Sequence, residues 1–238
     1  MTEAVTAPRL AIIGNGRMGR AVHQLATEQG WPVVATIGRA ESAELEQSLA
    51  GADVAIEFTN GAAAPDNVRA CLRAGVPVVV GTTGWLAELD RVRHDVSEAD
   101  GAMFWAPNFS IGANIFWRVA QRAAELAATL PGFDAAIVET HHTAKLDAPS
   151  GTAIELERRV SGALGHDVPV TSVRVGHVPG THQLILDGKF EQVSVEHVAR
   201  DRRVFAEGAL LAARWLVRTV AAGSRGTFTM DNLLDEGR

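Results

Sequence analysis

Hydrophobic and polar residues follow two different patterns along this chain, and the change comes near Asn108. In the first half, short apolar runs (9–14, 32–37, 53–58, 76–81 and 102–106) alternate with segments of helical period (17–30, 41–49, 66–74 and 85–99). Strands separated by helices at this spacing pair in parallel, with right-handed crossovers. The run at 76–80 is apolar without alternation, as expected of a strand that is buried on both faces.

The second half has longer helices and strands that lie close together in the sequence. Helices are predicted at 111–130 and 150–164, strands at 133–139, 171–177, 181–186 and 190–199, and a final helix at 203–222 before a short tail. Asp187-Gly188 is a hairpin signal between the last two strands. Strands with little helix between them favour a mixed or mostly antiparallel sheet. The predicted fold is therefore α/β, a Rossmann-like parallel sheet domain followed by a smaller α+β domain.

A glycine-rich turn stands at the end of the first predicted strand. Residues 10–19 read LAIIGNGRMG, a strand that runs into GxGxxG and then into a helix. In such a turn Gly14 would allow the tight bend, Gly16 the close approach of a pyrophosphate, and Gly19 the packing of helix on strand. The start of the helix would receive the phosphates. We expect a dinucleotide site; a plain glycine-rich turn is the alternative.

The end of the second predicted strand bears on the choice of cofactor. NAD-preferring sites place an acid there, whereas this chain has Ile37-Gly38-Arg39. Arg39 could pair with a 2′-phosphate, which favours NADPH over NADH. An exposed surface arginine is the alternative, and Arg17 is a second candidate phosphate partner.

The densest polar segment is the loop at 139–153, which reads ETHHTAKLDAPSGTA. Ser150 resembles a helix N-cap, and the N–H groups of Gly151 and Thr152 would favour a carboxylate or phosphate. Lys145 is a candidate general acid, because a lysine near other cations gives up its proton more readily. A solvent-exposed loop without a catalytic or binding role is the alternative.

Two adjacent histidines in this loop raise the question of a metal. His141 and His142 would point to opposite faces of an extended strand, so they are poorly placed to ligate one ion together. The sequence has no H-E-x-x-H motif. No metal site is expected.

Composition narrows the class of protein. The chain of 238 residues is 47% hydrophobic and has a net charge of −6, which argues against a nucleic-acid binder. Its single cysteine excludes a disulfide framework and suits a reducing compartment. Without a signal peptide or a long apolar run, we expect a soluble, cytoplasmic protein that does not bind a membrane.

Several motifs in order resemble the dihydrodipicolinate reductase (4-hydroxy-tetrahydrodipicolinate reductase) family of lysine and diaminopimelate biosynthesis. They are GNGRMGR at 14–20, EFT at 57–59, GTTG at 81–84, APNFS at 106–110, the loop at 139–153, GTH at 180–182, FAEGA at 205–209 and FTM at 228–230. The loop and the APNFS string are far more specific than the glycine turn. The resemblance runs nearly from end to end.

The resemblance implies a reaction and roles for individual residues. A nicotinamide would deliver hydride to C4 of a cyclic dicarboxylate, with loss of water and addition of a proton at C3. His141 and Lys145 match the catalytic histidine and the proton donor, and His142, Ser150, Gly151 and Thr152 match substrate-carboxylate contacts. The expected cofactor-binding residues are Gly14, Asn15, Gly16, Arg17, Met18, Gly19, Arg39, Phe58, Gly81, Thr82, Thr83, Ala106, Pro107, Asn108 and Phe109.

The family also implies a domain division and an assembly. Residues 1–108 and 203–238 would form the dinucleotide-binding domain, and residues 109–202 the substrate-binding and oligomerisation domain of a homotetramer. We expect closure of the two domains over a hinge near Asn108 and Arg203.

The chain departs from the family at three points. It is short between Arg39 and Asp53, Glu57 stands where relatives usually have aspartate, and Asn60 replaces a position that is often basic. Gly38 and Asn60 together leave the cofactor preference open.

Two other functions remain open. A relative of aspartate or homoserine dehydrogenase would explain the glycine turn but not the string from Lys145 to Thr152. A nucleotide-sensing protein without turnover would have no need of His141 and Lys145 together. Oxidation of NADPH in the presence of substrate discriminates among the three.

Overall fold

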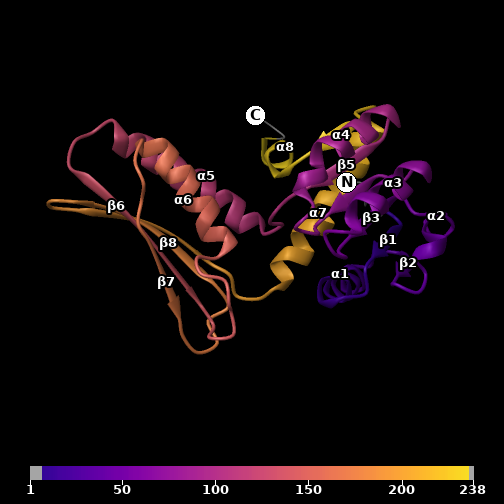
Figure 1. The fold of residues 1–238 in the computed structure, drawn as a ribbon, viewed down its shortest axis with the longest axis horizontal. Helices are drawn as coiled ribbons and strands as arrows, with labels where there is room; N and C mark the ends of the chain where they lie inside the picture. Colours follow the sequence, from indigo (N-terminus) through magenta and orange to yellow (C-terminus); the bar gives the residue numbers. More distant parts are fainter. Residues whose placement is uncertain (1–6, 236–238) are drawn as a thin grey trace, which may run out of the picture. The chain divides into compact units, whose positions relative to one another are not determined.

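The structure, a computed structural model, describes residues 7–235. It divides into two compact units: the first ends at Phe109 and resumes at Phe205, and the second is Ser110–Val204. Each unit has its own sheet and its own hydrophobic core (Figure 1). Among the described residues, no helix combines the length and the apolar character needed to cross a membrane.

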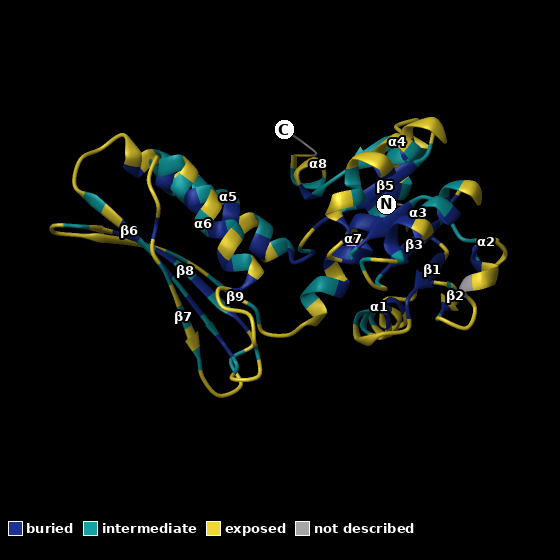
Figure 2. Ribbon diagram, viewed as in Figure 1, coloured by how far each residue is buried: buried dark blue, intermediate teal, exposed yellow. Residues whose placement is uncertain are grey.

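The first unit is built on a parallel sheet of six strands in the order β10-β5-β4-β3-β1-β2. Its strands are β1 (Leu10–Ile13), β2 (Val33–Ile37), β3 (Val54–Glu57), β4 (Val78–Val80), β5 (Ala102–Trp105) and β10 (Gly226–Phe228). Every residue of β1, β3 and β4 is buried, and Figure 2 draws this centre of the sheet in dark blue. Burial on both faces explains why these runs are apolar without alternation.

Helices cover this sheet and connect its strands. They are α1 (Arg17–Glu28), η1 (Ser42–Glu44), α2 (Leu45–Ser48), α3 (Ala64–Arg73), η2 (Leu86–Glu88), α4 (Leu89–Glu98), α7 (Arg203–Ala221) and α8 (Met230–Asp235). The helix predicted at 41–49 is broken into a 3-10 turn and one short α-helical turn, because the shortened crossover leaves room for little more.

The C-terminal tail, which was predicted without secondary structure, contains β10 and α8. β10 pairs with β5 in parallel, and Phe228 packs edge-on against Trp215 of α7, with ring centroids 5.2 Å apart. A strand of three residues is too short to give a periodic signal, so sequence patterning missed it.

The second unit has a mixed sheet in the order β7-β6-β8-β9, made of β6 (Phe133–His141), β7 (Val170–Arg174), β8 (Thr181–Gly188) and β9 (Gln192–Val198). β6 and β7 are parallel and the other two pairings are antiparallel, which confirms the predicted mixed, mostly antiparallel sheet. Helices α5 (Ile111–Ala128) and α6 (Gly151–Leu164) lie side by side over one face (Figure 1). Trp117 and Leu156 from these helices pack with Ile137 and Leu184 of the sheet.

Several boundaries in this unit differ from the prediction: β7, predicted to reach 177, ends at Arg174, and α5 ends at Ala128 rather than at 130. β6 continues two residues beyond Glu139 and ends at His141, because its pairing with β7 extends that far. The β8–β9 hairpin is confirmed, but Asp187 still pairs with Gln192, so the turn follows it. The N–H of Gly188 closes this turn by donating to the carbonyl of Glu191 at 2.8 Å.

Candidate active site

The segments predicted to bind a nucleotide all follow strands of the parallel sheet. Gly14 follows β1, Phe58 follows β3, Gly81 follows β4 and Ala106 follows β5. Because these strands are parallel, their carboxyl ends share one edge of the sheet. β1 lies between β2 and β3, so the strand order reverses there: β2 is added on one side of β1, and β3, β4 and β5 are added on the other. Ligands of open α/β sheets bind at this kind of switch point.

The glycine turn has the geometry of a phosphate cradle. Gly14 has a φ of +109°, and a Cβ there would overlap the carbonyl of Phe58. A Cβ on Gly19 would overlap the carbonyl of Gly14, whereas Gly16 faces open space. Within the described residues no side chain caps α1, while Ser150 caps α6. The first turn of α1 is therefore suited to an anionic ligand.

The remaining predicted cofactor residues differ in exposure. Asn15, Arg17, Arg39, Thr83 and Pro107 are exposed, whereas Met18, Phe58, Gly81 and Asn108 are half-buried and Thr82, Ala106 and Phe109 are buried. The hydroxyl of Thr82 accepts from the N–H of Thr59 at 2.7 Å, and its carbonyl accepts from the indole of Trp85 at 2.8 Å. Thr82 thus joins the loops after β3 and β4.

Glu57 is at the centre of the same loops, and sequence reasoning gave it no role. Its fully buried carboxylate accepts from the N–H and the hydroxyl of Thr59 and, at 3.2 Å, from the amide of Asn67. Burial raises the pKa of Glu57, and hydrogen bonds from Thr59, Thr82 and Asn67 offset the shift only in part. The sequence held one signal for a role of Glu57: an acid directly follows the buried apolar residues of a strand.

An acid also lies beside the end of β2, where the sequence placed Gly38 and Arg39. The carboxylate of Glu41 accepts from the N–H of Gly38 at 2.9 Å. The turn after β2 thus places the carboxylate of Glu41 next to Gly38, three residues earlier in the sequence.

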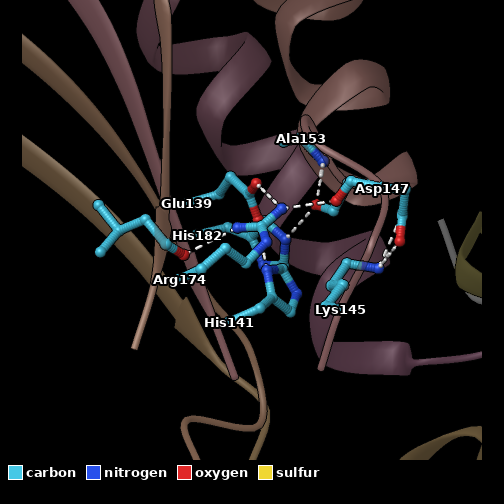
Figure 3. A network of polar contacts seen from close by, with 9 residues as sticks. Glu139, His141, Lys145, Asp147, Ala153, Arg174 and His182 are labelled. Atoms are coloured by element: carbon cyan, nitrogen blue, oxygen red, sulfur yellow. Dashed lines mark hydrogen bonds and ion pairs between the residues drawn. The ribbon is translucent and has the colours of Figure 1, made fainter. Parts of the chain in front are cut away.

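In the second unit, Glu139 and His141 lie two residues apart on β6 and therefore share a face of the sheet. Arg174 of β7 pairs in register with His141, and His182 of β8 pairs in register with Glu139. Figure 3 shows these four side chains pointing toward one another. Sheet register thus gathers residues that are far apart in the sequence.

Glu139 is held between a guanidinium and an imidazole. Nη2 of Arg174 lies 2.7 Å from Oε1 of the carboxylate, and Nδ1 of His141 contacts Oε2. Burial favours the neutral acid, but hydrogen bonds from Arg174 and Ser172 and the charge of His141 outweigh it and lower the pKa of Glu139 to about 2. Glu139 is therefore a buried anion.

Burial dominates the two histidines of this cluster. It lowers the pKa of His141, although the adjacent Glu139 opposes the shift. Burial, together with the nearby charges of His141 and His197, lowers the pKa of His182 to about 4. The rings of His141 and His182 meet edge-on, with centroids 5.1 Å apart. Both imidazoles are therefore mainly neutral at pH 7.

His182 connects this cluster to the start of α6. Its Nε2 lies 3.0 Å from the hydroxyl of Ser150, which also accepts from the N–H of Ala153 at 3.2 Å. Gly151 and Thr152 form the first turn of α6, and the indole of Trp117 donates to the carbonyl of Thr152 at 3.1 Å. Ser150 is therefore the N-cap of α6, as the sequence predicts.

The loop between β6 and α6 is tied to β7 by Arg174, which donates to the carbonyl of Asp147 at 2.6 Å. The ammonium of Lys145 lies 2.8 Å from the carboxylate of Asp147, and the Lys145 side chain is 23% exposed. His142 is half-buried, and its carbonyl accepts from the N–H of Lys145 at 3.1 Å. The structure thus brings His141, Lys145 and Ser150 into one network.

Sequence reasoning missed part of this network. Glu139 had a usable signal, since an acid two residues before a histidine on a strand shares its face. His182 belongs to the GTH motif, but no role was predicted for it. Arg174 gave no signal, because only sheet register places it opposite His141.

The cluster also bears on metal binding. Ligand-type atoms of Glu139, His141 and His182 lie within 4.8 Å of one another, a different set from the adjacent pair His141 and His142. Arg174 already pairs with Glu139, and Ser150 contacts His182. A guanidinium at this distance opposes a cation, so we assign no metal ligands here.

Comparisons with known proteins agree along nearly the whole chain. Two family models match, dihydrodipicolinate reductase, N-terminus, over residues 8–109 and dihydrodipicolinate reductase, C-terminus, over residues 112–234. A 4-hydroxy-tetrahydrodipicolinate reductase of Archaeoglobus fulgidus is 35% identical over 263 residues, covering 95% of this chain and 100% of the relative. One of Christiangramia forsetii is 32% identical over 240 residues, covering 95% and 98%.

Solved structures share the fold. A dihydrodipicolinate reductase from Paenisporosarcina sp. TG-14, solved with bound dipicolinate, has a TM-score of 0.72 at 22% identity, covering 93% of this chain and 97% of that one. A DAP dehydrogenase of C. glutamicum has a TM-score of 0.58 at 16% identity, covering 98% and 100%. The family models and the relatives, taken with the fold, establish that this chain belongs to the dihydrodipicolinate reductase family.

Proposed function

We propose that this chain is a 4-hydroxy-tetrahydrodipicolinate reductase that uses a reduced nicotinamide nucleotide. The observation that carries the proposal is the network that connects His141, Lys145 and Ser150 through Glu139, Arg174, Asp147 and His182. It lies in a chain that the family models match over residues 8–109 and 112–234. The substrate loses its 4-hydroxyl together with a proton from C3 as water, and a bound nicotinamide would then supply a hydride to C4 while C3 takes up a proton in return. The family match leaves no support for an aspartate or homoserine dehydrogenase.

The residues of the second unit would hold the substrate and move its protons. His142 and the first turn of α6, Ser150 to Thr152, would bind the two carboxylates, since a helix start favours anions. Lys145 would give the proton that C3 receives, and His141 would exchange a proton at Nε2. The dipicolinate in the Paenisporosarcina relative is a dicarboxylate, which supports this assignment.

The residues of the first unit would hold the nucleotide. The uncapped start of α1 and the open space at Gly16 suit the pyrophosphate. The other positions expected to line the nucleotide are Asn15, Arg17, Met18, Phe58, Gly81, Thr82, Thr83, Ala106, Pro107, Asn108 and Phe109. They follow four strands that end at one edge of the sheet, as a dinucleotide site requires.

NADPH is the proposed preferred cofactor, with Arg39 as the partner of its 2′-phosphate. Glu41, beside Gly38, offers an acceptor for the 2′-hydroxyl of NADH, so NADH would also be used. Arg39→Ala should reduce kcat/KM with NADPH selectively, and Glu41→Ala should do so with NADH. Equal losses with both cofactors would remove Arg39 from the site.

Turnover tests the proposal directly. The substrate is generated in the assay by the preceding synthase, and oxidation of NADPH is followed by its absorbance. Lys145→Ala should lower kcat by about 100-fold or more, because it removes a general acid. Lys189→Ala, which changes the other lysine of the same unit, is the matched control and should keep wild-type activity.

A nucleotide sensor is the rival outcome of this assay. If the wild-type chain binds NADPH, as nucleotide fluorescence would detect, yet gives no turnover, the reductase proposal is wrong. Turnover that survives Lys145→Ala unchanged would retain the reductase and reject the proposed proton donor.

A homotetramer is the proposed assembly. Helices α5 and α6 cover one face of the second sheet, and the other face carries Val138, Ile185 and the exposed Val173 and Val198. An uncovered apolar face of this kind favours association through the sheet. Light scattering should give four chains for the wild type and a smaller assembly for Val198→Glu.

A further inference from the structure

The buried carboxylate of Glu139 faces a single nitrogen of the His141 ring, and the family comparisons assign it no role. We propose that Glu139 is a positioning residue that keeps a proton on Nδ1 of His141 and so reserves Nε2 for the substrate. This inference rests on the proposed function only for its kinetic consequence. The state of the ring itself can be measured without turnover.

The first step is the charge of Glu139. The side chain has no exposed surface, and Arg174 donates to Oε1 at 2.7 Å. Arg174 is in turn fixed by the carbonyls of Asp147 and Val173, at 2.6 and 2.8 Å. A guanidinium held in this way keeps the carboxylate ionised and leaves Oε2 directed at His141.

The second step is the position of the proton in the contact between Nδ1 of His141 and Oε2 of Glu139. An ionised carboxylate only accepts, so Nδ1 of His141, in contact with Oε2, must carry the proton. A neutral imidazole has one N–H, which leaves Nε2 as an acceptor. The proton on Nδ1 therefore fixes which atom of the ring can exchange a proton with a ligand.

Gly180 supports the assignment from the other side of the ring. A Cβ at this position, where φ is +153°, would lie 3.1 Å from Nε2 of His141 and 3.3 Å from Cδ2. Glycine therefore leaves space next to Nε2. The protein holds one ring nitrogen with a carboxylate and keeps the neighbourhood of the other open.

The other groups that face the ring strengthen the need for Glu139. Lys145 of the loop and Arg174 of β7 are cations, and His182 of β8 is a mainly neutral ring whose Nε2 contacts Ser150. His197 of β9 stacks on the far side of His182, with centroids 6.3 Å apart. The charge of Glu139 opposes the effect of these two cations on His141.

Glu139→Gln makes a specific prediction because Arg174 can only donate. The amide oxygen must face Arg174, which directs the NH₂ group at Nδ1 of His141. Nδ1 must then accept, so the proton moves to Nε2. The substitution keeps the shape of the side chain while it inverts the tautomer. Glu139→Asp keeps the carboxylate, and with it the tautomer, but the shorter side chain increases the distance from the carboxylate to Nδ1 of His141.

The kinetic arm compares these variants with the wild type. Glu139→Gln should lower kcat by about 100-fold with KM changed by less than about threefold, because proton exchange is lost while the carboxylate contacts remain. Glu139→Asp should recover part of kcat. Glu125→Gln, which changes a half-buried glutamate of α5 whose carboxylate lies 2.9 Å from Arg122, is the matched control.

The spectroscopic arm records ¹⁵N chemical shifts of the His141 ring at neutral pH in each variant. The inference predicts the Nδ1–H tautomer in the wild type and in Glu139→Asp, and the Nε2–H tautomer in Glu139→Gln. A folded Glu139→Gln variant with an unchanged tautomer, or with wild-type kcat, would overturn it. A wild type without turnover would overturn the proposed function instead, and the ring tautomer would then decide this inference alone.

Discussion

Glu57 in the first unit and Glu139 in the second invite comparison, because both are fully buried near the carboxyl end of a strand yet have opposite pKa shifts. Burial raises the pKa of Glu57, and its partners Thr59, Thr82 and Asn67 do not cancel the effect. The pKa of Glu139 is lowered to about 2, although it is equally buried.

The difference lies in the charge of the donors. Neutral amides and hydroxyls stabilise an anion too weakly to replace water, whereas the guanidinium of Arg174 replaces it well. Burial alone therefore does not tell a structural acid from a chemical one. Glu57 contacts the loops after β3 and β4, at the carboxyl ends of the parallel strands. Glu139 supplies a negative charge beside the proposed proton-exchanging residues.

The largest expected effect comes from Arg174→Met. It leaves the Glu139 anion buried without its guanidinium and should reduce the free energy of unfolding by about 3–5 kcal/mol. Adding Glu139→Gln to this variant should restore much of the loss, since the uncompensated charge is gone. Urea unfolding of the two single variants and the double variant measures the coupling; strictly additive losses would reject the ion pair.

Acid should affect Glu139 next most strongly. Its folded pKa lies below the ordinary value of 4.5, so its contribution is present above pH 4.5 and is lost as pH falls toward about 2. A shift of this size corresponds to about 3 kcal/mol. Glu139→Gln should therefore be less stable than the wild type at pH 7, and the gap should narrow in acid. A gap that is constant with pH would contradict the shift.

Glu57→Gln should show the opposite pH dependence with a smaller amplitude. Because the folded pKa of Glu57 is raised, the wild type loses stability as pH rises above 4.5. The variant carries no such group, so it should gain relative to the wild type over that range. Unfolding free energies measured across pH give the sign, and a relative loss for the variant would refute the comparison.

The smallest expected effect is that of Asp147→Asn on stability. Its ion pair with Lys145 involves a carboxylate that is 60% exposed, so the loss should stay within about 1 kcal/mol. Thermal unfolding measures it. A loss as large as that of Arg174→Met would remove the distinction between the buried and the exposed pair.

Sequence patterning predicted most of the fold for a physical reason. Strands buried on both faces, such as β3 and β4, need uninterrupted apolar runs, and the turn from Gly14 to Gly19 needs residues without side chains. The three-residue β10 was missed because it is too short for any period to show.

The candidate site was only partly predictable. His141, Lys145 and Ser150 lie in one loop, so composition and resemblance pointed to them. Arg174 reaches Glu139 only through the parallel pairing of β6 with β7, and the length of β6 was itself underestimated. Contacts set by strand register are not encoded in any local pattern, which is why the charged partner of Glu139 was missed.

Carboxyl ¹³C shifts of the two glutamates, assigned with Glu57→Gln and Glu139→Gln, test the central contrast most directly. As the folded protein is titrated from pH 7 down to about pH 4, the Glu57 signal should move to its protonated position with a midpoint above the ordinary glutamate value, while the Glu139 signal should stay at its ionised position. A Glu139 signal that titrates at or above the ordinary glutamate pKa would contradict the account.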